Sequence, residues 1–500
     1  MDQTTDSDLI SLRGISKAFA GVQALDDVSL TIGRGEIVCL AGENGSGKST
    51  LIKILAGAQA ADKGEITLND KAYRRVSPIE AVHEGIQVIF QDFSLFPNLT
   101  VAENIALNDA LSHGRALVDW RGVHRTAREA LDKVGVDIDL DARVENLPVA
   151  DKQLVAIARA LVGDARLIVM DEPTTALTER EVRTLLGIIR RLQQDGVSVL
   201  FVSHKLNEVF EVCEKIAVLR NGRKVADGPV GDFDLESLTF HMTGRRFSAD
   251  GEKRAIPQDA RELMRVEALG KKDGFQEVSF SLLAGEVLGV AGLLGSGRTE
   301  LAEALFGLRP ADSGRIFIEG EPVALRDVRH AINCGIGYVP EDRLTEGLFL
   351  PQAIERNIVV GSIDRLAGRS GFLDFGAMRR QVDEWLDNLK IATPSARSPV
   401  QSLSGGNQQR VMLARWLATE PRILILNGPT VGVDVGSKVD IHEIIDDLAR
   451  KGIGVIVISD DIPELLRACD RILIMKAGRV VEEVGQADTS ESGLARRLVS

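Results

Sequence analysis

Residues 41–50, AGENGSGKST, combine the residue types that bind phosphate groups. They follow an apolar run, residues 37–40, and precede a run compatible with a helix, residues 51–55. Glycines let a backbone approach an anion closely, and the amides at a helix N-terminus favour negative charge. In such a loop the lysine reaches the β- and γ-phosphates, and the serine after it ligates Mg²⁺. The pattern predicts a nucleoside triphosphate site formed by Gly42, Glu43, Asn44, Gly45, Ser46, Gly47, Lys48, Ser49 and Thr50.

Four polar side chains follow apolar runs and could complete this chemistry. Asp171 and Glu172 end the run 167–170, where the first carboxylate would hold Mg²⁺ and the second would orient or deprotonate the attacking water. Such a base contributes about 10²–10⁴ in rate. Gln91 can contact metal and water, and His204 can contact the γ-phosphate. We therefore predict Glu172, Gln91 and His204 as catalytic residues, and Ser49, Gln91 and Asp171 as metal ligands.

Each of these residues also has an explanation without chemical function. Lys48 could be a chance lysine in a glycine-rich turn, Asp171 and Glu172 an incidental pair of surface carboxylates, and Gln91 and His204 ordinary polar residues after strands. The order of all these residues around one phosphate loop favours the chemical interpretation. Short apolar runs at 167–170, 199–202 and 216–219 alternate with helical patterns such as the amphipathic segment 120–134. This alternation predicts an α/β fold with a parallel sheet covered on both faces.

The chain repeats itself. GEIVCLAG at residues 35–42 returns as GEVLGVAG at residues 285–292, an offset of 250, and residues 147–161 match residues 403–417 at an offset of 256. We therefore predict two homologous domains, residues 1–245 and 262–500, joined by a polar linker at residues 246–261.

Composition narrows the class of function. The 500 residues are 44% apolar and 27% charged, as in ordinary globular proteins, and the net charge is −13. An acidic chain without a basic tail disfavours general nucleic-acid binding. The four cysteines form no CxxC pair, no apolar run reaches about eighteen residues, and the N-terminus is too polar for a signal peptide. These features predict a location in the cytosol or on the cytosolic face of a membrane.

Both halves resemble the ATP-binding-cassette (ABC) ATPase domains, and the resemblance covers essentially the whole chain. It implies two tandem P-loop NTPase domains, each with a parallel-sheet core, an antiparallel β subdomain and a helical subdomain. It also implies ATP and Mg²⁺ as cofactors, and a head-to-tail sandwich with nucleotide at the interface. LSGGNQQ at residues 403–409 resembles the family's signature motif, so that Ser404, Gly405 and Gly406 would grip ATP bound to the opposite half. Asp434 resembles the D-loop aspartate, and Phe19 is a candidate for stacking on adenine or, alternatively, a core phenylalanine.

The second half departs from the first at the positions that carry chemistry. Arg298, Glu341, Asn427, Gly428 and Asp460 stand where the first half has Lys48, Gln91, Asp171, Glu172 and His204. Conversely, LPVAD at residues 147–151 lacks the signature, and Thr178 replaces Asp434. We predict one hydrolytic composite site and one degenerate site, the latter formed by Gly292, Gly295, Gly297, Arg298, Thr299, Glu341, Asn427, Gly428 and Asp460.

The tandem layout is similar to the ATP-binding subunits of bacterial carbohydrate importers of the ribose, xylose and galactose group. The likeness rests on TVAENI at 100–105, MTGR at 242–245, PEDR at 340–343 and the arginine of the second phosphate loop. Asn427 and Gly428 depart from that group, whose second half usually keeps an Asp-Glu pair. The resemblance implies a membrane permease dimer, contacted near residues 91–99 and 341–348, and a periplasmic sugar-binding protein. It places the chain as a peripheral protein on the cytoplasmic face of the inner membrane, in contact with the membrane only through the permease.

Two other functions are compatible with tandem cassettes. One is a ribosome-acting translation factor, which the short linker and the acidic charge disfavour. The other is a non-hydrolysing regulator, which Asn427 and Gly428 favour and the complete first-half set opposes.

Overall fold

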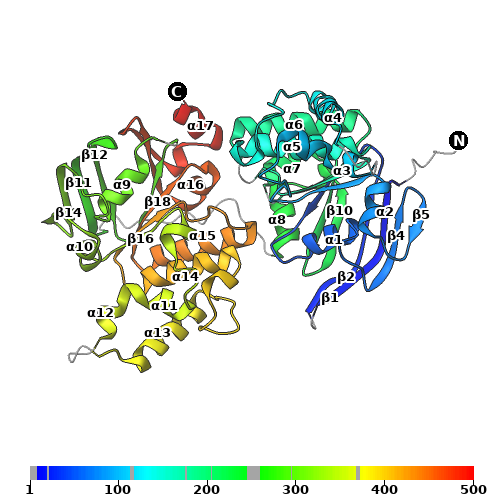
Figure 1. Ribbon diagram of the computed structural model, residues 1–500. Coiled ribbons are helices and arrows are strands. Elements are labelled where there is room, and N and C mark those ends of the chain that lie inside the picture. Colours follow the sequence, from blue (N-terminus) through cyan, green and yellow to red (C-terminus); the bar gives the residue numbers. More distant parts are fainter. Residues whose placement is uncertain are drawn as a thin grey trace. The chain divides into compact units, whose positions relative to one another are not determined.

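The computed structural model describes residues 8–19, 22–112, 118–174, 177–203, 205–244, 260–293, 295–367 and 372–499. The chain divides into two compact units, a first half, Met1–Phe247, and a second half, Ser248–Ser500, which are separated by colour in Figure 1. The predicted linker falls almost wholly on residues 245–259, which lie outside the described residues, so its bounds stay a prediction.

The first half is built on a six-stranded sheet. Its apolar strands are buried on both faces, as expected for parallel strands between layers of helices. Only the edge strand β10 runs antiparallel to its neighbour. The strand order is β10 (Arg223–Pro229), β9 (Lys215–Arg220), β3 (Ile37–Ala41), β8 (Ser198–Val202), β7 (Leu167–Asp171) and β6 (Ile86–Ile89). The helices that alternate with these strands are α1 (Lys48–Leu55), α2 (Pro78–His83), α6 (Glu179–Gln194), α7 (Leu206–Val212) and α8 (Leu235–Thr243).

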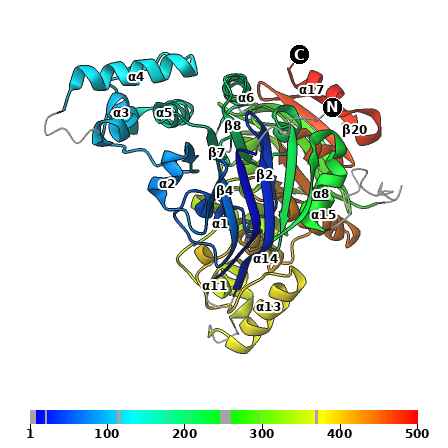
Figure 2. The ribbon, with the colours of Figure 1, turned by 90° about the vertical axis from the view of Figure 1, so that its right-hand side faces the viewer.

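Two further parts complete the first half. An antiparallel sheet has the order β2 (Val22–Ile32), β1 (Ile10–Phe19), β4 (Lys63–Leu68) and β5 (Lys71–Tyr73). The helices α3 (Val101–Ser112), α4 (Trp120–Val134) and α5 (Val149–Val162) gather on one side of this half, away from the antiparallel sheet (Figure 2). α4 begins at the N-cap Asp119 and ends at Gly135, which adopts a left-handed conformation, so its bounds agree with the predicted amphipathic helix.

The second half repeats this architecture strand for strand. Its mixed sheet has the order β16 (Ile336–Val339), β17 (Ile423–Asn427), β18 (Gly454–Ser459), β13 (Val287–Ala291), β19 (Arg471–Lys476) and β20 (Arg479–Gly485). Its antiparallel sheet has the order β12 (Phe275–Leu283), β11 (Glu262–Lys271), β14 (Ser313–Ile318) and β15 (Glu321–Val323). The helices are α9 (Arg298–Leu305), α10 (Val328–Asn333), α11 (Ile354–Val359), α12 (Ile363–Leu366), α13 (Phe375–Asn388), α14 (Gly405–Leu417), α15 (Val435–Arg450), α16 (Ile462–Ala468) and α17 (Glu491–Val499). The predicted α/β class with tandem repeats is confirmed.

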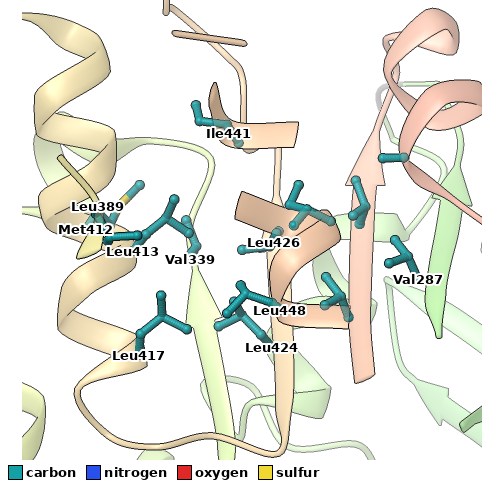
Figure 3. Packing of buried hydrophobic residues seen from close by; sticks show 14 of the residues in the cluster. Val287, Val339, Leu389, Met412, Leu413, Leu417, Leu424, Leu426, Ile441 and Leu448 are labelled. Carbon is teal, nitrogen blue, oxygen red and sulfur yellow. The ribbon is translucent and has the colours of Figure 1, made fainter. Parts of the chain in front are cut away.

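The core of the second half fixes the helix that begins at the signature motif. Met412, Leu413 and Leu417 of α14 pack in one buried cluster with Leu424 and Leu426 of β17 (Figure 3). Each fully buried side chain of this size contributes about 1.5–3 kcal/mol. α14 is therefore held firmly against the sheet. Within the described parts of the chain, no helix has both the length and the apolarity needed to cross a lipid bilayer.

Candidate functional site

The first phosphate loop requires glycine at two close contacts. Gly42, at φ 151°, follows β3, and a Cβ there would lie 2.3 Å from the carbonyl oxygen of Leu219. Gly47, at φ 107°, is the N-cap of α1, and its Cβ would lie 2.6 Å from the carbonyl oxygen of Ala24. These contacts seat the loop against its neighbouring strands and leave its amides at the start of α1, where an anion binds well.

Lys48 and Ser46 supply the polar groups of this loop. Lys48 is buried, and its Nζ donates to the carbonyl oxygens of Gly42 at 2.7 Å and Glu43 at 2.9 Å. Ser46 is also buried, and its hydroxyl has no hydrogen-bond partner among the residues that the structure describes. A buried ammonium and an unpaired hydroxyl at the start of a helix fit a polyphosphate. The predicted loop geometry is therefore compatible with nucleotide.

The carboxylates predicted as metal ligand and base lie beside this loop. Burial raises the pKa of Asp171, the charge of Glu172 raises it further, and the charge of Lys48 lowers it. Glu172 has a φ of 50°, and its amide donates to the carbonyl oxygen of Val202 at 2.8 Å. A left-handed conformation at a residue other than glycine costs of order 1–3 kcal/mol and is often found at functional sites. The fold thus holds Glu172 in a strained, fixed position.

The remaining predicted residues of the first half have mixed outcomes. β6 ends at Ile89, and Gln91 is exposed in the turn that follows. Phe19 ends β1 and is 44% exposed, with Lys17 Nζ 5.5 Å from its ring centroid. The alternative of a core phenylalanine is therefore wrong. His204 lies outside the described residues, and its role stays a prediction.

The second phosphate loop is built the same way but carries an ion pair. Arg298 is buried at the start of α9, and its Nη1 donates to the carbonyl oxygen of Gly292 at 2.6 Å. Its Nη2 lies 3.3 Å from Oδ2 of Asp460, the residue after β18. The two substitutions that replace Lys48 and His204 therefore meet each other. Gly295 and Gly297 keep the left-handed conformation of the first loop, with φ of 79° and 93°.

In the second half, Gly428 stands at the position of the predicted base Glu172 and has little space for a side chain. Asn427 is buried at the end of β17, and Gly428 follows at φ 59°. A Cβ on Gly428 would lie 2.8 Å from Cγ2 of Val431 and 3.0 Å from Cγ of Glu341. At Gly428 the second half therefore keeps the left-handed backbone that Glu172 has in the first half, but Val431 and Glu341 leave little space for a side chain.

A cavity of about 470 Å³ lies beside Thr299 and Asn427, and its lining is acidic. Sequence reasoning did not single out Glu303 and Tyr338 in this wall. Glu303 stands at the offset of 250 from Lys53, so comparison of the halves along α1 and α9 could have found the reversal of charge. Burial raises the pKa of Tyr338 to about 12. The lining comprises Thr299, Glu303, Tyr338, Glu341, Asp342, Arg343, Leu344, Glu346, Asn427, Val431 and Gly432.

The signature motif of the second half forms the start of α14. Ser404 is the exposed N-cap, and its Oγ accepts from Nδ2 of Asn407 at 2.9 Å. A Cβ on Gly406 would lie 1.9 Å from Oγ of Ser437, so glycine is required where α14 meets the start of α15. In the first half Pro148 is the N-cap of α5 and offers no hydroxyl. The loss of the first signature thus removes a donor without moving the helix start.

Arg343 joins the segments around this motif. Its guanidinium donates to the carbonyl oxygens of Val431 at 2.9 Å and Gly432 at 2.8 Å. A Cβ on Gly405 would lie 3.0 Å from Nη2 of Arg343. One side chain therefore spans the turn after β16, the start of α14 and the loop after β17. We missed this role from the sequence because the three segments are distant along the chain.

A protein-family model described as ABC transporter matches residues 25–175 and 275–431, one match in each half. The chain belongs to the ABC transporter family. It binds ATP and is an ATPase, as predicted from the resemblance. It is 43% identical over 484 residues to the ribose import ATP-binding protein RbsA 1 of Rubrobacter xylanophilus. The matched region covers 97% of this chain and 96% of that protein.

A second relative of this ABC transporter protein comes from Pseudomonas syringae pv. tomato. It is a putative ribose/galactose/methyl galactoside import ATP-binding protein, 42% identical over 97% of this chain and 91% of its own length. Among solved structures, a nucleotide-free ATP-binding cassette from an ABC transporter covers 45% of this chain and 92% of its own, with 27% identity and a TM-score of 0.41.

Helix capping accounts locally for one residue that the ABC resemblance singles out. Asp434 is the N-cap of α15 and accepts from the amide of Ser437 at 2.8 Å. Thr178, its counterpart, is the N-cap of α6 and forms a capping box with Glu181. Both residue types suit an N-cap. A role of Asp434 toward nucleotide stays a prediction.

Proposed function

We propose that this protein hydrolyses ATP at one consensus site and thereby drives a membrane permease that imports a sugar, a monosaccharide such as ribose. One observation carries the proposal: Lys48, Asp171 and Glu172 converge on one phosphate loop, whereas their counterparts in the second half are replaced. The relatives are named as ATP-binding proteins of ribose or of ribose, galactose and methyl galactoside import, which supports a sugar as the cargo.

Each group of the first site has an assigned task. Lys48 would bind the phosphates, and Ser49, Gln91 and Asp171 would hold Mg²⁺. Glu172 would orient the attacking water and accept its proton. Mg²⁺ supplies positive charge that neutralises the phosphate oxygens. His204 contacts the terminal phosphate, and the exposed ring of Phe19 stacks on adenine.

We propose further that the second half completes this site in trans. Ser404, Gly405, Gly406 and Asp434 would act on nucleotide held by the first phosphate loop. Support comes from the exposed hydroxyl of Ser404 at the start of α14, a firmly packed helix, while Pro148 offers none. The second site, with Arg298, Asn427, Gly428 and Asp460, would contribute no hydrolysis because Gly428 supplies no base.

A pair of exposed phenylalanines supports permease docking. Phe96 is 47% exposed and Phe349 is 56% exposed, and each amide donates to Oδ1 of a buried asparagine, Asn104 at 2.8 Å and Asn357 at 2.9 Å. They lie in or next to the two segments expected to contact the permease. Two like surfaces on one chain fit the two like subunits of a permease dimer. The periplasmic sugar-binding protein would reach this chain only through that permease, and the chain would lie peripherally on the cytoplasmic face of the membrane.

Each docking loop is tied to the helix that starts at a signature position. Arg159 of α5 donates to the carbonyl oxygens of Phe93 at 2.9 Å and Ser94 at 2.7 Å. Arg415 of α14, at the offset of 256, donates to the carbonyl oxygens of Gly347 and Asn357. Displacement of either loop would therefore be transmitted to its helix.

The decisive experiment reconstitutes the chain with its co-expressed permease and binding protein in vesicles. We expect ribose, xylose or galactose to stimulate ATP hydrolysis several-fold and to accumulate in the compartment that the cassettes face. The Glu172→Gln variant should bind ATP and abolish both signals. Hydrolysis unaffected by any sugar, or co-sedimentation of the chain with ribosomes instead of the permease, would contradict the proposal.

A further inference from the structure

The arginine of the second phosphate loop is paired with a carboxylate from the neighbouring strand end, Asp460 after β18. Arg298 is buried at the base of this loop, and the carboxylate of Asp460, 60% exposed, contacts the guanidinium from the solvent side. The sheet explains the meeting, because β13 and β18 run parallel with Ala291 opposite Ser459. The residues that follow these strands, Gly292 and Asp460, are therefore neighbours at one edge of the sheet.

The loop itself retains features that accept an anion. Its backbone keeps the left-handed glycines, and α9 starts at Arg298. Ser296 is buried, and its hydroxyl has no hydrogen-bond partner among the described residues, as for Ser46 in the first loop. These features fit the inner phosphates of a nucleotide. The second loop differs from the first in that its basic residue, Arg298, is already paired with a carboxylate, that of Asp460.

We propose that Asp460 is a specificity-determining residue that competes with a terminal phosphate for Arg298, so that the second site takes a nucleoside diphosphate in preference to a triphosphate. This inference rests on the proposed role of the second loop as a nucleotide site. Nη1 of Arg298 is bonded to the loop carbonyl of Gly292, so Nη2 is the group directed toward the ligand, and Asp460 contacts it. A triphosphate must displace this carboxylate, whereas a diphosphate carries less charge toward it.

The surrounding charges act in the same direction. Glu303 and Glu341 line the adjacent cavity where the first half has Lys53 and Gln91. Burial raises the pKa of Glu303, and the charges of Glu300 and Glu346 raise it further, while Arg309 lowers it. The lining beyond the loop thus carries four carboxylates, Glu303, Glu341, Asp342 and Glu346, against one arginine, Arg343. Glu303 is itself paired with Arg309 at 3.2 Å, so Arg298 is the cation of the loop for which nucleotide and Asp460 compete.

Equilibrium dialysis of the full chain with radiolabelled ATP or ADP tests the proposal. The measurements are made in a Glu172→Gln background, which prevents turnover. Adding Lys48→Ala weakens nucleotide binding at the first loop, so that the binding that remains is assigned to the second loop. We expect Asp460→Asn to tighten ATP binding at that loop about tenfold, because it removes one partly screened charge next to the phosphate. ADP binding there should change much less, and ATP binding at the first site should not change.

The matched control is Asp447→Asn, which removes an exposed carboxylate paired with the exposed Arg450 near the end of α15. It should leave both affinities unchanged. Equal gains for ATP and ADP, an equal gain in the control, or no gain in ATP binding, including no binding at the second loop in any variant, would each overturn the proposal. Failure of the first site to bind ATP would instead count against the proposed function.

Discussion

Glu172 and Gly428 hold one backbone conformation at the same point of the two repeats, with φ of 50° and 59°. Each amide donates at 2.8 Å to the strand alongside, to the carbonyl oxygen of Val202 or Ile458. The residue after β7 and the residue after β17 therefore share a left-handed conformation although their side chains differ. The second half has glycine at this position, and the first half keeps a glutamate there in spite of the strain.

Replacing Glu172 should exchange activity for stability. Glu172→Gly should abolish ATP turnover and raise the free energy of unfolding by about 0.5–1 kcal/mol, since relief of the left-handed strain exceeds the added entropy of the unfolded chain. Glu172→Gln should abolish turnover with no gain in stability. Phosphate release and chemical denaturation measure the two effects. A Glu172→Gly variant that still turns over ATP would remove Glu172 from the role of base.

The two signature positions should respond unequally. Ser404→Ala removes a donor proposed to act on ATP, and we expect ATPase activity to fall on the order of a hundredfold, as for loss of one preorganised donor. Pro148→Ala, at the same helix start in the first half, should leave activity within about twofold, because no donor is lost. Steady-state phosphate release is the measurement. Equal effects of the two substitutions would contradict the trans arrangement.

Phe96 and Phe349 should matter only with the permease present. Replacement of either by alanine should abolish most of the sugar-stimulated ATPase activity in vesicles while the basal activity of the isolated chain persists. The reason is that both rings are exposed and neither residue belongs to the proposed catalytic set. The recorded ring contact of Phe349 is with the guanidinium of Arg415, 5.3 Å from the ring centroid. Phe375→Ala, which removes another exposed ring on α13, is the control. Loss of basal activity in the Phe96 variant would point to a folding defect instead.

Glu464 should make the second half less stable as pH rises. Burial raises the pKa of this carboxyl from 4.5 to about 7, opposed by the hydrogen bond from Ser459. The folded state therefore holds a proton between pH 4.5 and 7 that the unfolded chain has lost. Its stabilising effect is complete below pH 4.5 and disappears as pH rises through 7, a change of a few kcal/mol.

Glu464→Gln keeps a neutral side chain of the same size and should flatten this dependence. Thermal unfolding between pH 5 and 8 would show it, with exposed Glu491→Gln as the control. Parallel curves for the wild type and Glu464→Gln would show that the carboxyl is already charged in the fold.

The sequence predicted the elements well because buried parallel strands are short apolar runs. β7 was expected at residues 167–170 and extends to Asp171. The repeat predicted β17, the equivalent strand of the second half. The contact of Arg298 with Asp460 was not predicted, because it depends on which strands become neighbours in the sheet. For the same reason the sequence left open whether Phe19 is buried, and it contained no sign that Gly406 must accommodate Ser437.

The arginines Arg159 and Arg415 have a mechanical consequence. A push on either docking loop cannot be absorbed by the loop alone, since its carbonyl groups are bonded to a side chain of a long helix. The second half has glycine, Gly428, where the first has the proposed base Glu172, but the contact between loop carbonyl and helix arginine is present in both halves. If ATP is hydrolysed only at the first site, as proposed, both halves would still be able to transmit the resulting motion to the two subunits of the permease.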